Sequence, residues 1–257
     1  MKRILILLAA AWLSAGCGLL TSINWDQERI ASATGKAVTA MSISDEQIIE
    51  LCRQSVEQLD KQNTIDNGTY LTRLRRLMSG VGKINGMTLN FKVYRTNEIN
   101  AFASGDGSVR VYSGLMDLMT DDELVAVIGH EIGHVVHQDS KNALKKAYMA
   151  SAASDLVGAA GSVGAVTQGL AGNIAEALVN AQFSQKQEYS ADEYGFEFSV
   201  ALGRDPYGMY SSLMKLTNLA ESDRASTVAQ MFSSHPDNLK RAERMKVKAD
   251  NYVKSKK

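Results

Sequence analysis

Cysteine is scarce in this chain of 257 residues, which contains only Cys17 and Cys52. Two cysteines cannot build the set of disulfides that holds many small secreted proteins together. If Cys17 is lipidated, as the leader described below predicts, Cys52 is the one thiol left and no disulfide can form within the monomer. We expect Cys52 to be buried on a helix that begins near Ser44; an intermolecular disulfide is the alternative.

An excess of charge of either sign is also missing, since 28 Lys and Arg balance 28 Asp and Glu. Without residues 1–16, which include Lys2 and Arg3, 26 basic residues stand against 28 acidic ones, a net charge of −2 with His neutral. No basic cluster is interleaved with aromatic residues, so the sequence predicts no nucleic-acid partner. The chain has no repeats or long linkers. We expect one domain over residues 44–257, preceded by a tether over residues 17–43.

Histidine occurs only four times, and two of the four form the motif H-E-x-x-H at residues 130–134. In a helix, His130 and His134 lie on one face, so both imidazoles can bind one metal ion. Glu131 then lies close enough to take a proton from a water molecule on that metal. The alternative is a surface helix that carries two His by chance, because so short a pattern also occurs in unrelated chains.

The residues around the motif favour a metal. Thr120 and Glu123 are spaced as a capping box, in which each side chain bonds to the backbone amide of the other residue. The following apolar residues recur at helical spacing: Leu124, Val125, Val127, Ile128, Ile132 and Val135. A largely buried helix has little reason to carry two His and a Glu unless something pairs with them. The sequence therefore predicts one bound Zn²⁺.

A catalytic zinc site has a third protein ligand and leaves its fourth position to water. His137 follows His134 by three residues, which turns it partly off the metal face, and we interpret it as a polar residue at the helix end. The metzincin extension of the motif, which would supply another His, is absent. We therefore expect the third ligand to be an acidic residue on a later helix.

Glu188 and Asp192 lie one turn apart on such a helix. Ser184 and Gln187 are spaced as the capping box of its start, and the helix should end near Gly203. Two acids on the packed face of a helix are costly without a cation or donors to meet them. Glu188 as a zinc ligand, with Asp192 as the acceptor for a ligating imidazole, would meet that need. A solvated acidic turn is the alternative.

The motifs H-E-I-G-H and E-Y-S-A-D resemble the E-x-x-A-D branch of the gluzincins, the family of HtpX and the CAAX prenyl protease. The resemblance spans residues 44–244, and the layout behind a lipoprotein leader is similar to the LoiP/YcaL group of bacterial periplasmic peptidases. In that family the Glu of E-x-x-A-D binds zinc, which implies Glu188 as the third ligand. A later His and an Arg six residues on match His235 and Arg241, so both are expected to face the scissile carbonyl.

The implied role of His235 agrees with the chemistry. Attack by water on a peptide carbonyl creates an oxyanion, and a neutral or cationic donor beside it lowers the barrier. His235 would be that donor, with Arg241 adding positive charge or fixing His235 through a shared partner. The alternative is that His235 merely precedes Pro236 at the start of a helix, where proline suits the first turn.

Three segments predict a small antiparallel sheet. Residues 89–94 alternate apolar and polar, and residues 99–103 and 109–112 predict two strands joined by the turn Gly105-Asp106-Gly107. By analogy with the family, an edge strand binds an extended peptide by β-augmentation, and its residues would be Asn100, Ala101, Phe102 and Ala103. The alternative, that these strands simply cover the core, is compatible with this role.

The expected fold class is α+β: a mainly helical domain with that small sheet and two crossing helices that carry the zinc ligands. Ala191 and Gly195 are small, which would let the second zinc helix approach the first closely. Two further helices are expected over residues 44–60 and 70–78.

The first sixteen residues predict a lipoprotein signal peptide. Lys2 and Arg3 are followed by an apolar stretch, residues 4–13, that is too short to span a bilayer stably. Residues 13–17 resemble a lipobox, although Ser14 stands where the pattern most often has Leu. Lipidation of Cys17 would anchor a periplasm-facing protein in the bacterial envelope, and the absence of Asp after Cys17 favours the outer membrane over the inner. A plain secreted protein is the alternative.

Residues 147–177 are dominated by Ala, Gly and Ser. The stretch without charge, residues 156–175, has the length of a transmembrane helix, but its glycines, polar residues and few large apolar side chains argue against insertion. We expect small-residue helices or a flap that limits access to the cleft.

The sequence thus predicts a zinc endopeptidase whose substrates, by resemblance, are misfolded or misassembled envelope proteins. A zinc-containing chaperone or assembly factor, working with the outer-membrane assembly machinery, is one alternative. A hydrolase of cell-wall peptides or small amides is another.

Overall fold

The computed structural model describes residues 44–147, 177–221 and 225–257. Contacts within the chain divide it into two units, residues 1–43 with 146–168 and residues 44–145 with 169–257. All the helices and strands named below belong to the second unit. The predicted leader and tether and nearly all of the small-residue segment lie outside the described residues. Among the described residues, no helix combines the length and apolar character needed to cross a membrane.

Two helices precede the sheet, as the sequence predicts. Helix α3 (Asp45–Gln62) begins with a capping box formed by Ser44 and Gln47. Helix α4 (Thr69–Leu77) follows. Cys52 is fully buried on α3, which confirms the first interpretation of this residue.

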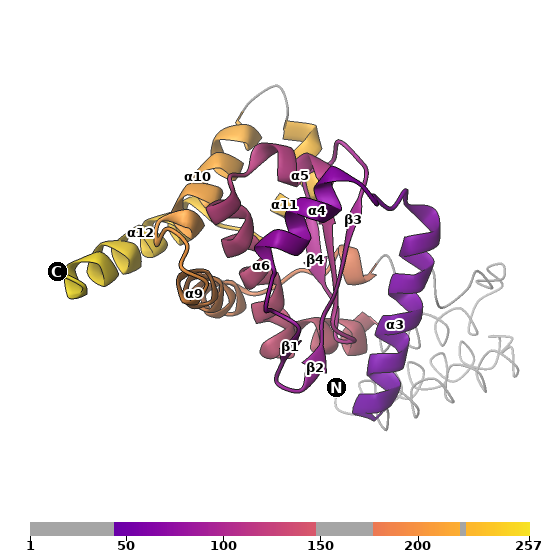
Figure 1. The fold of residues 1–257 in the computed structure, drawn as a ribbon. Coiled ribbons are helices and arrows are strands. Elements are labelled where there is room, and N and C mark those ends of the chain that lie inside the picture. Colours follow the sequence, from indigo (N-terminus) through magenta and orange to yellow (C-terminus); the bar gives the residue numbers. More distant parts are fainter. Residues whose placement is uncertain (1–43, 148–176, 222–224) are drawn as a thin grey trace, which may run out of the picture. The chain divides into compact units, whose positions relative to one another are not determined.

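The main sheet has three strands in the order β3-β5-β4: β3 (Asn90–Tyr94), β4 (Ala101–Ala103) and β5 (Ser108–Tyr112). A two-stranded antiparallel hairpin, β1 (Lys83–Ile84) with β2 (Met87–Thr88), precedes it. Strands β4 and β5 form the predicted antiparallel hairpin. The expectation of a wholly antiparallel sheet is wrong, because β3 pairs with β5 in parallel. Strand β4 lies at the edge opposite β3, and β5 fills the place between them (Figure 1). Strand β5 runs antiparallel to β4 and therefore parallel to β3.

Helices cover both faces of this sheet. Side chains of one parity, including Val93, Val109 and Val111, pack with α4 and with the helix that carries H-E-x-x-H. Side chains of the other parity, Tyr94, Phe102 and Tyr112, pack with Val56 and Leu59 of α3. Because successive residues of a strand face opposite sides, a strand buried on both faces loses the alternation of polar and apolar residues.

The helix that carries H-E-x-x-H, α6 (Asp121–Val136), follows the short helix α5 (Ser113–Leu118). Its predicted capping box is present: the Thr120 hydroxyl accepts from the Glu123 amide, and the Glu123 carboxylate accepts from the Thr120 amide. Every residue from Glu123 to His134 is buried. The helix therefore runs through the core, and its polar side chains need partners there.

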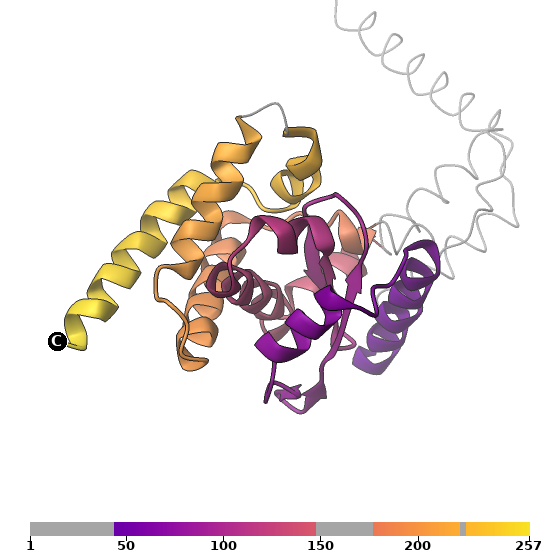
Figure 2. The same ribbon diagram turned by 45° about the horizontal axis from the view of Figure 1, so that its top comes forward.

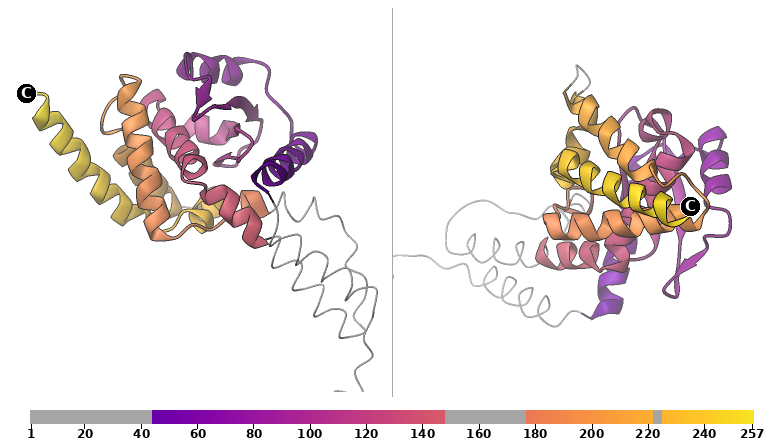
Figure 3. Two further views of the ribbon diagram at one scale, coloured as in Figure 1. Left: turned by 90° about the horizontal axis from the view of Figure 1, so that it is seen from below. Right: turned by 90° about the vertical axis from the view of Figure 1, so that its left-hand side faces the viewer.

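The helix that carries Glu188 and Asp192, α9 (Gln185–Ala201), begins with the predicted Ser184–Gln187 capping box. Three helices follow: α10 (Gly208–Ala220), α11 (Ala225–Ser234) and α12 (Asn238–Ser255). Helices α10 and α12 lie side by side (Figure 2). Helix α12 also contacts α9, and it crosses the outer side of both (Figure 3).

Glycines allow α6 and α9 to cross in close contact. A Cβ atom on Gly129 would lie 3.0 Å from the Cα of Gly195, and one on Gly133 would lie 3.1 Å from the Cα of Ala191. A Cβ atom on Gly195 would lie 2.7 Å from the carbonyl oxygen of Ala126. The close approach predicted from Ala191 and Gly195 is thus present, and the α+β class with two crossing helices that carry the predicted ligand residues is confirmed.

Candidate metal centre

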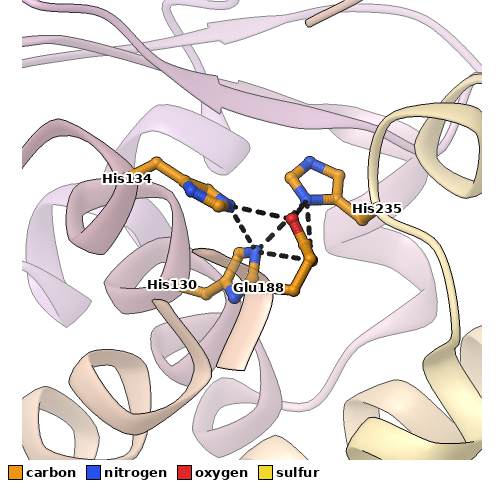
Figure 4. Close-up of side chains that lie close together, drawn as sticks. All are labelled: His130, His134, Glu188 and His235. Carbon is orange, nitrogen blue, oxygen red and sulfur yellow. Dashed lines mark hydrogen bonds and ion pairs between the residues drawn. The ribbon is translucent and has the colours of Figure 1, made fainter. Parts of the chain in front are cut away.

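Four buried side chains meet where α6, α9 and the end of α11 come together (Figure 4). His130 and His134 come from α6, Glu188 from the first turn of α9, and His235 from the connection between α11 and α12. Each offers one ligand atom, and these atoms lie within 4.8 Å of one another. None of the four residues is more than 6% exposed.

The spacing of these atoms suits a tetrahedral zinc ion. The Nε2 atoms of His130 and His134 are 3.1 Å apart, and His134 Nε2 is 3.2 Å from Glu188 Oε1. His235 Nδ1 lies 3.2 Å from His130 Nε2 and 3.1 Å from Glu188 Oε1. Zinc bonds of about 2.0 to 2.1 Å place tetrahedral ligand atoms about 3.3 Å apart. The geometry of the donor set therefore fits zinc.

The hydrogen bonds of the two α6 histidines explain why a cation belongs between them. His130 Nδ1 lies 2.9 Å from Asp192 Oδ1, and His134 Nδ1 lies 3.0 Å from Asp139 Oδ2. If each Nδ1 donates its proton to its carboxylate, both Nε2 atoms turn bare lone pairs toward each other. Two acceptors at 3.1 Å repel unless a cation or a proton lies between them.

The pKa values of the two imidazoles follow from these surroundings. Burial lowers the pKa of His130 to about 4, despite its bond to Asp192. Burial also lowers the pKa of His134, but hydrogen bonds to Asp139 and Glu188 outweigh burial and raise it.

Asp139 is a functional residue that the sequence analysis missed. It stands five residues after His134, just past the end of α6, where Gln138 adopts the left-handed conformation with φ 62°. That turn brings the Asp139 carboxylate back to the imidazole of His134. The spacing alone could not reveal this, because it depends on how the helix ends.

Arg241 lies behind the ligands. It is 2% exposed, and its Nη1 lies 2.5 Å from Glu188 Oε2. Its Nε and Nη2 bind both oxygens of Asp192, at 2.8 and 2.6 Å. The guanidinium thus shares Glu188 with His235.

The charged and hydrogen-bonding neighbours of Asp192 and Glu188 keep both carboxylates ionised. Burial would raise the pKa of Asp192, but the charge and hydrogen bonds of Arg241 lower it to about 2. Burial would likewise raise the pKa of Glu188, and the surrounding imidazoles hold it far below its usual range. Both groups are therefore acceptors, as metal ligation by Glu188 and orientation of His130 by Asp192 require.

Glu131 lies beside the ligand cluster but is not part of it. Its Oε1 has no hydrogen-bond partner among the described residues, and it lies 3.6 Å from His235 Nε2. Its carboxylate accepts a hydrogen bond from the backbone amide of Ala103, and burial raises its pKa to about 7. A carboxylate with a pKa near neutrality and a free oxygen is suited to accept and return a proton.

Strand β4, which was predicted to bind substrate, forms one edge of the main sheet. Its neighbour β5 bonds to Asn100, Phe102 and Ser104, so the polar backbone groups of Ala101 and Ala103 point away from the sheet. The Ala101 amide donates to the Asn100 side chain, and the Ala103 carbonyl accepts from Ser140 Oγ at 3.3 Å. The outer edge of β4 thus lies next to Glu131 but bonds internally in this structure.

Phe183 forms a wall of the site that no sequence pattern marks. It is half-buried just before α9, and its ring stacks on that of His134 with centroids 3.8 Å apart at 15°. The ring of His235 lies 5.7 Å away. His137, in contrast, caps the end of α6 and contacts Tyr194, as its predicted position outside the metal face requires.

Comparisons with known proteins agree with this geometry. The profile of "Peptidase family M48" matches residues 72–249. Metalloprotease LoiP of Escherichia coli (strain K12) is 38% identical over 249 residues, which cover 95% of both chains. Metalloprotease YcaL of the same organism is 34% identical over 249 residues, covering 95% of this chain and 96% of YcaL. A Protease HtpX homolog of Pyrococcus abyssi is 31% identical over 185 residues, 57% of this chain and 63% of its own. The H-E-x-x-H helix, the later Glu and the near-complete alignments lead to one conclusion: this chain is a metalloprotease of peptidase family M48.

Proposed function

We propose that the protein is a zinc-dependent endopeptidase that hydrolyses misfolded or misassembled proteins of the bacterial envelope. The observation that carries the proposal is the convergence of the Nε2 atoms of His130 and His134 with the buried Glu188 carboxylate, beside the Glu131 carboxylate with its free oxygen. The two Nε2 atoms and the Glu188 carboxylate fit a metal ion, and the Glu131 carboxylate fits a base.

His130, His134 and Glu188 would hold the zinc ion. These three come from two helices in close contact, whereas His235 comes from the short connection before α12. We therefore assign the first three residues to the metal and leave its remaining position to water and substrate. When bound, zinc lowers the pKa of a coordinated water molecule to about 7 and polarises the peptide carbonyl.

The protein's own side chains would carry the proton and stabilise charge. Glu131, with its raised pKa, accepts the proton of the attacking water and delivers it to the leaving amine. The imidazole of His235 spans the distance from Glu188 to Glu131, from where it can donate to the oxygen on which negative charge develops. Asp192 orients His130, and Arg241 holds Asp192 and Glu188 in place.

The substrate would be an extended peptide along β4. The outward amide of Ala103 already bonds to the Glu131 carboxylate, so a strand paired with this edge would pass beside the base. Pairing of main chains depends little on side chains, which suits an enzyme that meets many unfolded substrates. The substrate must displace two internal bonds of this edge, from Ser140 to the Ala103 carbonyl and from the Ala101 amide to the Asn100 side chain.

The location in the envelope rests on the leader. Signal-peptide removal and lipidation of Cys17 would tether the domain to a membrane with the site facing the periplasm, the outer membrane being favoured by Gly18 after Cys17. Membrane fractionation of the full chain tests this: the wild type should remain with the membrane and Cys17→Ser should not. Equal distribution of both proteins would refute the anchor.

The enzymatic proposal is tested with casein and with a stably folded protein as substrates. The chain that starts at residue 18 is assayed beside Glu131→Gln, and zinc is measured in both samples. We expect the wild type to cleave casein much faster than the folded protein, and Glu131→Gln to keep zinc without cleaving. Zinc in both samples with cleavage in neither would contradict the peptidase and favour a zinc-containing chaperone.

A further inference from the structure

We infer that Gln187 is a positioning residue that holds the metal ligand His134 through Asp139 and so couples the end of α6 to the start of α9. Neither Gln187 nor Asp139 belongs to the ligand set or to the base described above. The inference rests on the proposed metal site, since it concerns how that site is held in place.

A continuous chain of hydrogen bonds joins the two helices. His134 Nδ1 lies 3.0 Å from Asp139 Oδ2, and Gln187 Nε2 donates to the other oxygen of Asp139 at 2.7 Å. The Gln187 Oε1 atom accepts from the backbone amide and the hydroxyl of Ser184, at 2.9 and 2.7 Å. Asp139 is 5% exposed, so water contributes little to holding it. Both ends of the Gln187 amide are therefore committed.

The position of Gln187 explains why these hydrogen bonds matter for the metal site. Gln187 immediately precedes the ligand Glu188 on the first turn of α9, while Asp139 lies just past the end of α6. A carboxylate that bonds only to an imidazole can rotate with it, whereas one whose second oxygen is also bonded cannot. The orientation of His134 is thus tied to the start of the helix that supplies Glu188.

The choice of glutamine, not glutamate, supports the inference. A capping box accepts either residue at this position, and Glu123 fills the same role at the start of α6. Only the amide of glutamine carries a donor that can meet the carboxylate of Asp139. Glutamate at position 187 would keep the capping bonds to Ser184 but place its second oxygen against Asp139.

The test exchanges the donor and the acceptor. Gln187→Glu and Asp139→Asn each leave two like groups facing each other, whereas the double variant restores the bond in reverse. In the double variant, the carbonyl of the new amide at position 139 accepts from His134, and its NH₂ group donates to the new carboxylate at position 187. The net charge of the double variant equals that of the wild type. The readout is the zinc dissociation constant, measured by competition with a chromophoric chelator.

We expect each single variant to weaken zinc binding by about tenfold or more, as loss of a partner that orients a ligand does. The double variant should bind zinc more tightly than either single variant. Single variants with unchanged zinc affinity, or a double variant whose loss is the product of the two single losses, would overturn the inference.

The chain supplies its own control. Ser44 and Gln47 form a capping box of the same type on the exposed first turn of α3. Gln47→Glu should leave the zinc dissociation constant unchanged, which separates loss of a cap from loss of the link to Asp139. A wild type that binds no zinc would refute the proposed function itself, whereas a wild type that binds zinc without rescue in the double variant would refute only the coupling.

Discussion

The contact between α6 and α9 makes a sharp prediction about Gly195. A Cβ atom there would lie 2.7 Å from the carbonyl oxygen of Ala126, 2.8 Å from the amide nitrogen of His130 and 2.5 Å from Met209 Cε. The methyl end of Met209 can move, but the other two atoms belong to the backbone of α6. Gly195→Ala must therefore push α6 and α9 apart at His130, one of the proposed metal ligands.

The magnitude follows from two opposing effects. Alanine in place of glycine inside a helix stabilises it by about 1 kcal/mol. Overpacking of a core costs about 1 to 3 kcal/mol, and backbone atoms on the opposite side place this case at the upper end. We expect a net loss of about 2 kcal/mol in the free energy of unfolding. For a chain of this size that lowers the melting temperature by about 4 to 8 °C.

Two assays check this prediction. Thermal unfolding of the metal-free protein gives the loss of stability, and chelator competition gives the zinc dissociation constant, which should rise because His130 moves relative to Glu188. Gly82→Ala is the matched control, since a Cβ atom there meets nothing within 4 Å. If Gly195→Ala melted at or above the wild-type temperature with unchanged zinc affinity, the claim that this crossing positions the site would be refuted.

Three further predictions concern charge and metal. Burial would raise the pKa of Asp60, but hydrogen bonds from Arg110, Lys92 and Tyr94 lower it to about 2. The ionised Asp60 therefore stabilises the fold at pH values above its ordinary pKa of about 4, and this stabilisation is lost as the pH falls toward 2. Asp60→Asn should therefore lower the melting temperature at pH 7, and the gap to wild type should shrink in a pH series from 5 to 2.5; a constant gap would contradict the assignment. Arg241→Met should destabilise the metal-free protein by about 3 to 5 kcal/mol, because it leaves Glu188 and Asp192 without their cation. Chemical denaturation measures this loss of stability, which should be smaller when zinc is present. Removal of metal by a chelator should lower the wild-type melting temperature, and zinc at about a hundred times its dissociation constant should restore about 2.7 kcal/mol; calorimetry that showed no dependence on zinc would contradict the site.

The features that the sequence predicted well are those set by a few neighbouring residues. Two capping boxes begin helices α6 and α9 at the expected residues, because such a box depends only on residues three apart. The spacing in H-E-x-x-H places two imidazoles on one helical face for the same reason. The acidic pair on α9 could be assigned because two buried acids demand partners.

The features that the sequence could not predict depend on contacts between distant segments. The direction of β3 relative to β5 follows from the path of the connection to β4, which alternation of side chains does not encode. Asp139 reaches His134 through a left-handed residue at a helix end, and Phe183 reaches the same imidazole from the start of α9. The position of Arg241 behind Glu188 likewise emerges only when α12 packs on α9.

The most direct test of the central claim measures zinc content and cleavage of an internally quenched peptide for wild type, Glu131→Gln and Glu188→Gln. The account predicts about one zinc ion per wild-type chain together with cleavage. It predicts wild-type zinc affinity without cleavage for Glu131→Gln, and loss of zinc affinity with loss of cleavage for Glu188→Gln. Cleavage by Glu131→Gln at the wild-type rate, or wild-type zinc affinity in Glu188→Gln, would contradict the assignment of base and ligand.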